Sequence, residues 1–416
     1  MAKSRILVGI DIGTTKVSTL VVKHDEGEPL EVLGVGLAPS RGVQKGIVTD
    51  LDAATEVVAS SLDKAERLSG YKISAALLGI AGGHISCLQS KGSTTLPSGG
   101  EIGPREMQAA VEAAKTVDLP SQKEILHVIP RQYSLDGSPG IKDPQGMSGF
   151  RLEVDAHIVT AHVGAVQNAL KVLQRVGLEV DELVLQPLAS AQAVLSSAER
   201  DLGVALVDIG GGTTDVAVFI EDGIWHTAVL PVGGNNLTND LAIVLGIPVD
   251  SAERLKVEVA TAAGVPVSVA PLPGTGNTLK VETFGEDEYK TVPRDLVHEV
   301  VDSRLSEMLT MVQTELRRSG YDDMLPAGVV LTGGSAQMRG MEEKAARVLN
   351  MPVRIGSPAG LMGLGEAVES PAFATSVGLP LWRINRPGRP ARLARKAPER
   401  RSPPGKVFGW FREFLP

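Results

Sequence analysis

The sequence predicts an α/β protein built from two related lobes, and three observations lead to this prediction. The chain has 416 residues, more than one compact core usually holds, so at least two domains are expected. Segments with strand and helix periodicity alternate along most of the chain. IDIGTTKVSTLVV, which begins at Ile10, and VDIGGGTTDVAVFI, which begins at Val207, repeat the same order of Asp, Ile-Gly and a Thr-containing turn 197 residues apart. Such self-similarity indicates an internal duplication.

The first half of the chain is predicted to hold two units. β-branched and apolar residues flank the Gly-Thr-Thr-Lys turn at 13–16, which predicts two strands joined by a tight turn. The remaining predicted elements of this half are a strand near 30–37, a helix at 51–69, a separate unit of strands and one helix at about 84–162, a helix at 165–177, a strand at 182–186 and a helix at 188–199.

The second half is predicted to begin like the first. Residues 203–234 contain a strand, a Gly-rich turn, a second strand, an Asp-Gly hairpin and a third strand, as expected from the residue types at the turns. The further predicted elements are helices at 235–246 and 251–263, a less regular β segment, a long amphipathic helix at 293–320 and a strand, Gly turn and helix at 328–350. From about Asn385 the chain is rich in Pro, Arg and Gly, which predicts a disordered basic linker.

Composition narrows the class of protein. Hydrophobic residues make up 43% of the chain, and no apolar run approaches the roughly 18 residues that a membrane-spanning helix needs. Asp11 follows the basic start too soon for a signal peptide, and the single cysteine, Cys87, cannot form an internal disulfide. These features fit a reducing, cytoplasmic setting. The net charge is −8, yet residues 385–416 carry nine Lys and Arg against two Glu, so the acidic body argues against nucleic-acid binding.

The two Gly-Thr turns predict a phosphate site. Glycines let backbone N–H groups approach phosphate oxygens, and Thr hydroxyls add further donors. Lys16 can neutralise phosphate charge, and the matched carboxylates Asp11 and Asp208 can hold a hydrated Mg²⁺ between them. The alternative is that each turn only closes a hairpin. This alternative is reasonable for either turn taken alone, but the matched Asp and Thr positions of the two turns count against it. Strand-like residues follow both turns, which counts against a Rossmann site, and no P-loop is present.

Two further segments suit the nucleoside part of a nucleotide. In VLTGGSAQMRG, Gly333 and Gly334 end a strand and lead towards a helix, where backbone can pass close to a base and ribose. Glu253 and Lys256 share one helix face and can reach a ribose or purine. The alternative for this second pair, an ion pair on the surface, is favoured when the pair is considered alone.

The order of these segments resembles the actin-like ATPase superfamily, which includes DnaK-type chaperones, sugar kinases and MreB. Within it, the chain resembles the FtsA family of bacterial division proteins over about residues 5–382. The stretch HVIPRQYSLDGSPGIKDPQGMSGFRLEVDAHIV resembles the subdomain inserted in FtsA, and QPLASAQAVL, LTGGSAQMRGM and PAFATSVGL are further matches. The resemblance implies two lobes of ribonuclease-H-like sheets around an ATP cleft.

The resemblance also implies a division of the chain into parts. These are the first lobe (1–83, 163–200 and 357–384), the inserted subdomain (84–162), the second lobe (201–231 and 298–356), its insert (232–297), a basic linker (385–404) and a terminal amphipathic helix (405–416). The implied function is an actin-like polymer that tethers FtsZ to the inner leaflet of the cytoplasmic membrane at the division site, together with other division proteins.

The family's ATP and Mg²⁺ contacts carry over onto matching positions of this chain. Asp11 and Asp208 would lie near Mg²⁺. The residues implied to contact the nucleotide are Gly13, Thr14, Thr15, Lys16, Gly210, Gly211, Gly212, Thr213, Thr214, Glu253, Lys256, Gly333, Gly334, Ser335 and Met338. Gln186 has two interpretations: a residue that orients the attacking water in slow hydrolysis, or a buried structural amide. Cys87 and the seven histidines form no spacing typical of a nucleophile–base pair or a metal site.

The aromatic residues near the C-terminus predict a membrane-binding helix. On a helical wheel, one face gathers the apolar residues and the opposite face the charged ones, which suits a helix that lies among lipid headgroups. The proposed lipid-facing residues are Val407, Phe408, Trp410, Phe411, Phe414 and Leu415. The alternative is a helix docked on the body of the protein or on a partner. The basic linker favours the membrane, because Lys and Arg are attracted to anionic lipid.

Two other functions compete with a division anchor. One is a pilus-assembly platform protein of FtsA-like fold, and the other is a phosphotransferase of the sugar-kinase type. The second would need a catalytic Asp and a sugar pocket in the cleft, neither of which the sequence reveals.

Overall fold

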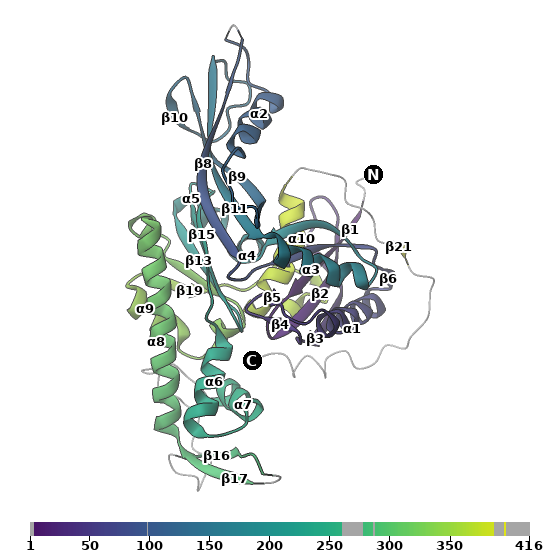
Figure 1. The fold of residues 1–416 in the computed structure, drawn as a ribbon, viewed down its shortest axis with the longest axis vertical. Coiled ribbons are helices and arrows are strands. Elements are labelled where there is room, and N and C mark those ends of the chain that lie inside the picture. Colours follow the sequence, from purple (N-terminus) through teal and green to yellow (C-terminus); the bar gives the residue numbers. More distant parts are fainter. Residues whose placement is uncertain (1–3, 98, 260–277, 286–287, 387–394, 397–416) are drawn as a thin grey trace.

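The computed structural model describes residues 4–97, 99–259, 278–285, 288–386 and 395–396. Two lobes lie side by side, and a third unit projects from them at the top of Figure 1. This arrangement confirms the predicted two-lobed α/β fold with an inserted subdomain.

The sheet of the first lobe has six strands. Its order is β12 (Glu179–Leu185), β7 (Ala75–Ile80), β1 (Arg5–Ile12), β2 (Lys16–His24), β3 (Glu31–Pro39) and β20 (Met362–Gly363). Strands β1, β2 and β3 are antiparallel neighbours, whereas β7 runs parallel to β1 and β12 parallel to β7. Two short antiparallel strands, β4 (Val43–Gln44) and β5 (Ile47–Val48), form a separate ribbon.

The sheet of the second lobe repeats this topology. Its order is β15 (Gly223–Leu230), β14 (Thr214–Ile220), β13 (Val204–Ile209), β18 (Val329–Thr332) and β19 (Val353–Ile355). Here too the first three strands are antiparallel, and the next two continue parallel to β13. The register matches as well, since Asp11 pairs with Ser18 and Asp208 pairs with Asp215. The duplication expected from the sequence is therefore present in the strand order.

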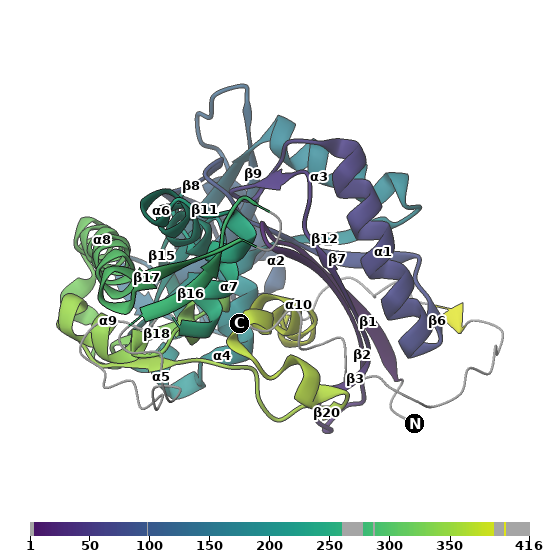
Figure 2. The same cartoon turned by 90° about the horizontal axis from the view of Figure 1, so that it is seen from below.

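Helices cover both faces of the first sheet. Helix α1 (Leu51–Ser69) begins where the Asp50 carboxylate accepts hydrogen bonds from two backbone N–H groups, and it ends at Gly70, whose φ of 72° is left-handed. Figure 2 shows α1 on the outer face of this sheet and α10 (Ala374–Asn385) on the face towards the second lobe. Alternate side chains of β1 supply the two faces, as the period of a strand requires: Ile10 packs in the α1 core and Leu7 in the α10 core.

Helix α10 was not expected from the sequence. Pro380 lies inside it, and a proline is normally a helix breaker because it removes an N–H donor. The helix nevertheless forms because its apolar residues are buried between the sheets, among them Val377, Leu379 and Trp382. It crosses α4 (Gln186–Val194) at Gly378, where a Cβ atom would overlap the carbonyl oxygen of Ala189. Only glycine permits so close a crossing.

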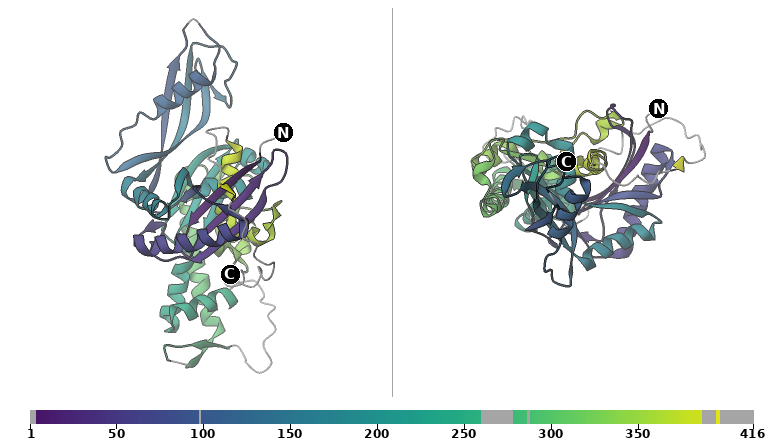
Figure 3. Two further views of the ribbon diagram at one scale, coloured as in Figure 1. Left: turned by 90° about the vertical axis from the view of Figure 1, so that its right-hand side faces the viewer. Right: turned by 90° about the horizontal axis from the view of Figure 1, so that it is seen from above.

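The inserted subdomain is a four-stranded antiparallel sheet with one helix. Its strand order is β10 (Ser138–Ile141), β9 (Lys123–Leu135), β11 (Arg151–His162) and β8 (Ile85–Thr95), and α2 (Pro104–Ala114) packs against it. Figure 3 shows it projecting away from both lobes. In the sequence it follows β7 and precedes α3 (Val163–Arg175), both in the first lobe. Its strands β8, β9 and β11 nevertheless contact β15 of the second lobe.

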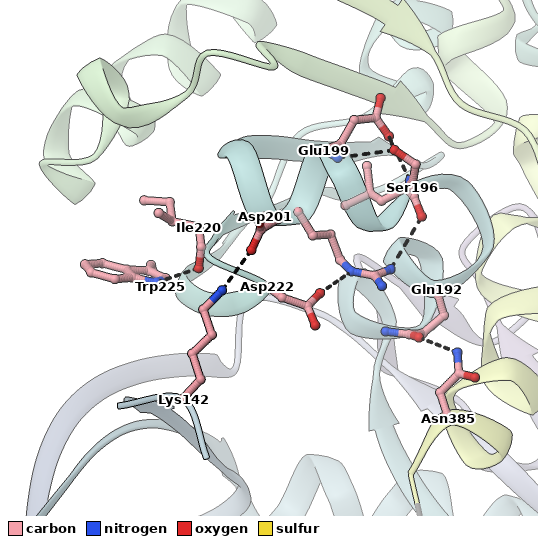
Figure 4. A network of polar contacts seen from close by, with 11 residues as sticks. Lys142, Gln192, Ser196, Glu199, Asp201, Ile220, Asp222, Trp225 and Asn385 are labelled. Atoms are coloured by element: carbon pink, nitrogen blue, oxygen red, sulfur yellow. Dashed lines mark hydrogen bonds and ion pairs between the residues drawn. The ribbon is translucent and has the colours of Figure 1, made fainter. Parts of the chain in front are cut away.

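The predicted helix at 188–199 is wrong in one respect, because the structure has two helices there. Helix α4 ends at Val194, and α5 (Ser197–Leu202) begins after Ser196, whose side chain accepts a hydrogen bond from the Glu199 N–H. The Ser196 N–H in turn donates to the Glu199 carboxylate. This reciprocal pair is a capping box, which starts a new helix. Figure 4 shows this cap beside an ion pair from Lys142 of the inserted subdomain to Asp201 of α5.

The second lobe carries the remaining helices. The lower part of Figure 1 contains α6 (Gly234–Leu245), α7 (Val249–Val259) and the hairpin of β16 (Thr278–Glu282) and β17 (Tyr289–Pro293). Helix α8 (Arg294–Ser319) runs along the side of the lobe, next to α9 (Met341–Leu349). None of the described helices combines the length and apolar character that crossing a membrane requires.

The predicted amphipathic helix at 405–416 and its six proposed lipid-facing residues lie outside the described residues. Within the predicted linker, Arg395–Lys396 forms β21, which pairs antiparallel with β6 (Tyr71–Lys72).

We predict that Gly378→Ala destabilises the protein because the added Cβ collides with backbone of α4. Overpacking of this kind costs about 1–3 kcal/mol in the free energy of unfolding. The matched control is Gly164→Ala in α3, where nothing lies within 4 Å of the added atom. Because alanine favours helix over glycine, urea denaturation should find the control as stable as the parent protein or more so. Equal midpoints for the two variants would contradict the role given to the crossing.

Candidate functional site

A cleft of about 930 Å³ lies between the two lobes, a size typical of small-molecule sites. Both Gly-Thr turns line it, together with the Gly333–Gly334 turn and helix α7. Every site residue predicted from the sequence in the described part of the chain lines this cleft, with the exception of Thr214. The structure thus brings four segments that are far apart in the sequence to one place.

The two Gly-Thr turns have the same backbone geometry. The Gly13 N–H donates to the Lys16 carbonyl at 3.0 Å, and the Gly210 N–H donates to the Thr213 carbonyl at 2.9 Å. The strand pairing next to the turns corresponds as well, since Ile12 pairs with Val17 and Ile209 pairs with Thr214. Lys16 in the first turn occupies the position that Thr213 occupies in the second.

This equivalence explains why Thr214 does not reach the cleft. Counted from the strand-end aspartates, Thr214 matches Val17, a core residue of β2 that is 0% exposed. Thr214 is itself 1% exposed, and its hydroxyl donates to the Val232 carbonyl at 2.8 Å. Its side chain stabilises the base of the turn, and Thr214 is not among the residues that line the cleft.

The two turns face each other at close range. A Cβ atom at Gly211 would overlap the hydroxyl of Thr15, and one at Gly212 would lie 2.6 Å from the hydroxyl of Thr14. Side chains at these glycines would therefore fill the space between the lobes. The two turns form a cradle lined by backbone and hydroxyl groups, which is the environment that phosphate oxygens require.

The strand-end carboxylates are held by neighbours in the first lobe's helices. The side-chain amide of Gln186, the first residue of α4, donates to Asp11 Oδ1 at 2.8 Å. Ser190, one turn further along α4, donates its hydroxyl to Asp208 Oδ2 at 2.7 Å. Helix α4 thereby fixes one aspartate from each lobe, which places the two carboxylates on opposite walls of the same cleft.

A third carboxylate, Asp215, was missed in the sequence analysis. It lies beside Asp208 in the antiparallel register, and Thr213 donates to its Oδ2 at 3.2 Å. Its Oδ1 has no hydrogen-bond partner among the described residues. The repeat itself could have revealed it. Asp215 stands seven residues after Asp208, just as Ser18 stands seven residues after Asp11. Of these two equivalent residues, Asp215 lines the cleft and Ser18 does not.

Burial disfavours the ionised form of these three carboxylates. It raises the pKa of Asp11 to about 7, an effect that Lys16 opposes and Asp208 reinforces. Burial also raises the pKa of Asp208, although hydrogen bonds from Ser190 and Thr375 oppose the shift. The pKa of Asp215 lies well above its usual value, first through burial and then through repulsion by Asp208. A cation bound among these groups would remove this repulsion.

These oxygens suit Mg²⁺ as a ligand set only in part. No cluster of three or more His, Cys, Asp or Glu side chains suited to a metal ion occurs in the part of the chain that the structure describes. Mg²⁺ usually takes one or two carboxylates and completes its shell with water and phosphate oxygens. Asp11 and Asp208 fit that pattern, with the unpartnered Oδ1 of Asp215 nearby.

The cleft holds one lysine between its acids. Lys16 Nζ is buried and has no hydrogen-bond partner among the described residues. Burial lowers the pKa of Lys16 to about 8, while Asp11 and Asp208 oppose that shift. A buried ammonium without an oxygen partner is an unusual arrangement, and an anion in the cleft would supply the missing acceptor.

The part of the cleft formed by the Gly333–Gly334 turn has a different character. Gly333 has a φ of 87°, and a Cβ there would collide with the Asp208 carboxylate, so this turn requires glycine. Ser335 donates its hydroxyl to the Gly210 carbonyl at 3.2 Å, which ties this turn to the phosphate cradle. Met338 and Val257 add apolar surface to the same cleft.

Glu253 and Lys256 form an ion pair with a separation of 2.7 Å at this end. Thr238 bridges them, since it hydrogen-bonds to Glu253 and lies 3.0 Å from Lys256 Nζ. Lys256 is largely buried, with 11% of its side chain exposed. Glu253 is more open, with 40% of its side chain exposed, and both residues line the cleft. Further residues that the sequence analysis missed here are Asn235, Asp250, Arg254, Gln337, Arg339, Pro371, Ala372 and Thr375.

The fold and the cleft together define the class of protein. The structure is similar to that of a PilM–PilN type IV pilus biogenesis complex, with a TM-score of 0.64 and 17% identity over 92% of this chain and 99% of the other. It is also similar to MreB 5 of Spiroplasma citri bound to AMPPNP, with a TM-score of 0.53 and 14% identity over 91% and 96%. The chain has the actin-like ATPase fold.

Sequence similarity assigns it within that class. Residues 205–378 match the family model for cell division protein FtsA, and residues 82–160 match that for the SHS2 domain inserted in FtsA. Cell division protein FtsA of Pseudomonas aeruginosa is 42% identical over 382 residues, which cover 92% of this chain and 90% of that protein. The chain belongs to the FtsA family of cell division proteins.

We predict that Asp215→Asn stabilises the nucleotide-free protein, and more so at high pH. The folded-state pKa of Asp215 is raised, so the carboxyl stabilises the fold below pH 4 and loses this contribution as the pH rises towards that pKa. The asparagine never ionises, so its advantage should be small at pH 4.5 and reach about 2–4 °C in melting temperature at pH 8.

Melting should be followed in EDTA, with Asp118→Asn at an exposed position as the control that shows no such trend. A parent protein that is more stable than Asp215→Asn at pH 8 would show that Asp215 is ionised and satisfied in the fold.

Proposed function

We propose that this protein binds ATP with Mg²⁺ in the cleft, polymerises as an actin-like filament and tethers FtsZ filaments to the inner leaflet of the cytoplasmic membrane at the division site. The observation that carries this proposal is the cradle formed by Thr14 and Thr15 against Gly211 and Gly212, in a chain of the FtsA family. Both lobes contribute to the cradle, so a bound triphosphate would hold them together.

Each part of the nucleotide has a matching surface in the cleft. The phosphates would lie between the two Gly-Thr turns, where Lys16 supplies an ammonium that has no oxygen partner in the described structure. Asp11 and Asp208 would hold Mg²⁺ through water, and the ion would neutralise charge on the phosphate oxygens. The adenosine would lie at the Gly333–Gly334 turn, with Met338 and the Glu253–Lys256 pair beside it. That MreB 5 of Spiroplasma citri binds AMPPNP in the same fold supports the choice of ligand.

In this proposal, Gln186 would orient a water molecule for slow hydrolysis. Its amide nitrogen donates to Asp11, and its amide oxygen is the group that would accept a hydrogen bond from the water. This pairing also explains the alternative structural role, because the same bond satisfies a buried carboxylate. The main role of the nucleotide in this proposal is to stabilise the closed, assembling form.

The tether would start from a fixed point on the body. Trp382 in the last turns of α10 donates to Glu182 Oε1 at 3.0 Å, and the Arg386 guanidinium lies 3.7 Å from the centre of the Trp382 ring. Asn385 donates to Gln192 of α4 at 2.8 Å (Figure 4). The chain therefore leaves a firmly packed helix before the basic linker begins, and the proposed amphipathic helix at 405–416 would reach the membrane from there.

One tail gives modest membrane affinity, because ordering its residues offsets much of the gain from partial burial of its apolar face. A filament that presents many tails would bind far more tightly through effective concentration. Membrane attachment and polymerisation are therefore expected to reinforce each other. Division-site partners other than FtsZ would join the same membrane-bound filament.

A pilus-assembly role is the second candidate considered, and the fold alone allows it. The PilM–PilN complex shares the architecture at 17% identity, whereas the FtsA protein of Pseudomonas aeruginosa matches at 42% over nearly the whole chain. Membership of the FtsA family therefore favours cell division.

We predict that Gly212→Ala weakens ATP binding at least tenfold. The added Cβ would lie 2.6 Å from the Thr14 hydroxyl and fill the proposed phosphate cradle. Isothermal titration calorimetry with Mg²⁺ measures the effect. Gly83→Ala, where nothing lies within 4 Å of the added atom, is the control that should bind like the parent protein. Unchanged affinity in Gly212→Ala would mean that the turn does not hold the phosphates.

We predict that removing residues 386–416 abolishes sedimentation with anionic vesicles. The truncated chain would retain the complete described body up to Asn385 and should still bind ATP. A second variant, Trp410→Glu with Phe411→Glu, keeps the basic linker and loses the apolar face. It should bind weakly and only at low salt, because only the electrostatic attraction remains. If the truncated and full-length proteins sediment equally with vesicles, the tail is not the anchor.

A further inference from the structure

We propose that Phe373 is a positioning residue for the proposed nucleotide site: the face of its ring holds the Lys16 ammonium at the phosphate end of the cleft. This inference rests on the proposed function, because Lys16 is the group that would meet the phosphates. The contact itself is a property of the described structure and can be tested without a nucleotide.

The geometry is that of a cation above an aromatic face. Lys16 Nζ lies 3.7 Å from the centre of the Phe373 ring, well within the roughly 6 Å at which the ring quadrupole attracts a cation. The Phe373 ring is 0% exposed, so water does not compete for this face. Attraction of this kind is strongest when both partners are removed from water.

The ring stabilises the ammonium in a way that an oxygen would not. Lys16 Nζ is buried and has no hydrogen-bond partner among the described residues, although Asp11 and Asp208 act on it electrostatically. A carboxylate in direct contact would occupy the N–H donors of the lysine. The ring offers attraction without an oxygen acceptor, so the donors stay available for an anion that enters the cleft.

Phe373 also belongs to a segment that meets the site at several points. The Pro371 carbonyl accepts a hydrogen bond from the Gly333 N–H at 3.2 Å, and Pro371 and Ala372 line the cleft. Two residues after Phe373, the Thr375 hydroxyl lies 3.4 Å from Asp208 Oδ2. The start of α10 therefore connects the nucleoside turn, the second strand-end carboxylate and the lysine of the first turn.

A purely structural role is the competing explanation. Phe373 packs in the core with Leu37, Val368 and Val377, and its removal would leave a cavity whatever its effect on Lys16. Substitution by a smaller residue therefore does not separate the two roles. Fluorination does, because added fluorine atoms weaken the ring quadrupole stepwise while the shape and apolar character of the ring change little.

The test incorporates mono-, di- and trifluorophenylalanine at position 373 of the full-length protein and measures ATP and AMP affinity by calorimetry. We expect the ATP dissociation constant to rise with each fluorine and to reach about tenfold for the trifluoro variant. The AMP dissociation constant should stay constant, because AMP lacks the β- and γ-phosphates. The same series at Phe219, which is 2% exposed and packs in the core between the lobes, should change neither constant.

A second measurement uses the nucleotide-free protein. Protons held above an aromatic face experience a ring-current shift, so the ε-methylene signal of Lys16 should lie upfield of other lysines and return to their range in Phe373→Leu. Lys16→Arg assigns the signal. If the parent protein binds no ATP, the proposed function is overturned. The ring-current shift would then still test whether Lys16 lies against the Phe373 ring. ATP binding that is insensitive to fluorination, or a Lys16 signal unchanged in Phe373→Leu, would overturn the inference.

Discussion

The close crossing of α4 and α10 is the constraint on which the arrangement of the two lobes depends. Gly378 allows the α10 backbone to approach the Ala189 carbonyl of α4, so both helices fit between the two sheets. Gln186 of α4 holds Asp11 from one lobe, and Ser190 of the same helix holds Asp208 from the other. Because both bonds come from α4, that helix relates the two strand ends to each other, and α10 adds the Thr375 hydroxyl 3.4 Å from Asp208 Oδ2.

A cleft built in this way contains more charge than it can satisfy alone. Asp11, Asp208 and Asp215 are buried with a single lysine between them, and burial raises the pKa of all three carboxyls. A bound nucleotide with its metal ion would balance these charges: the metal ion would lie near the carboxylates, and the phosphates would lie near Lys16. Closure of the lobes and occupancy of the site are therefore expected to be coupled, since the same groups lie on both walls.

Sequence periodicity predicted most elements, and its failures have local causes. Helix α1 was predicted with its observed ends from its helical spacing, and in the structure Asp50 and Gly70 cap those ends. Helix α10 was missed because Pro380 breaks the usual helix pattern, and burial between two sheets outweighs the lost hydrogen bond. The single helix expected at 188–199 divides at Ser196, where a capping box competes with continued helix. Thr214 was assigned to the phosphates through the family resemblance, whereas its side chain is buried and bonds to the Val232 carbonyl.

The sequence by itself determined the duplication, the Gly-Thr turns, the strand-end aspartates and the family resemblance, because each of these is a local pattern of residue types at fixed spacing. Only the tertiary structure decided which of them meet. Helix α4 brings Asp11 and Asp208 to one cleft, and the Phe373 ring comes to lie against Lys16. The contact of Phe373 with Lys16 joins residues more than 350 positions apart. The packing of two sheets against α4 and α10 creates it, and no local sequence pattern records how those layers come together.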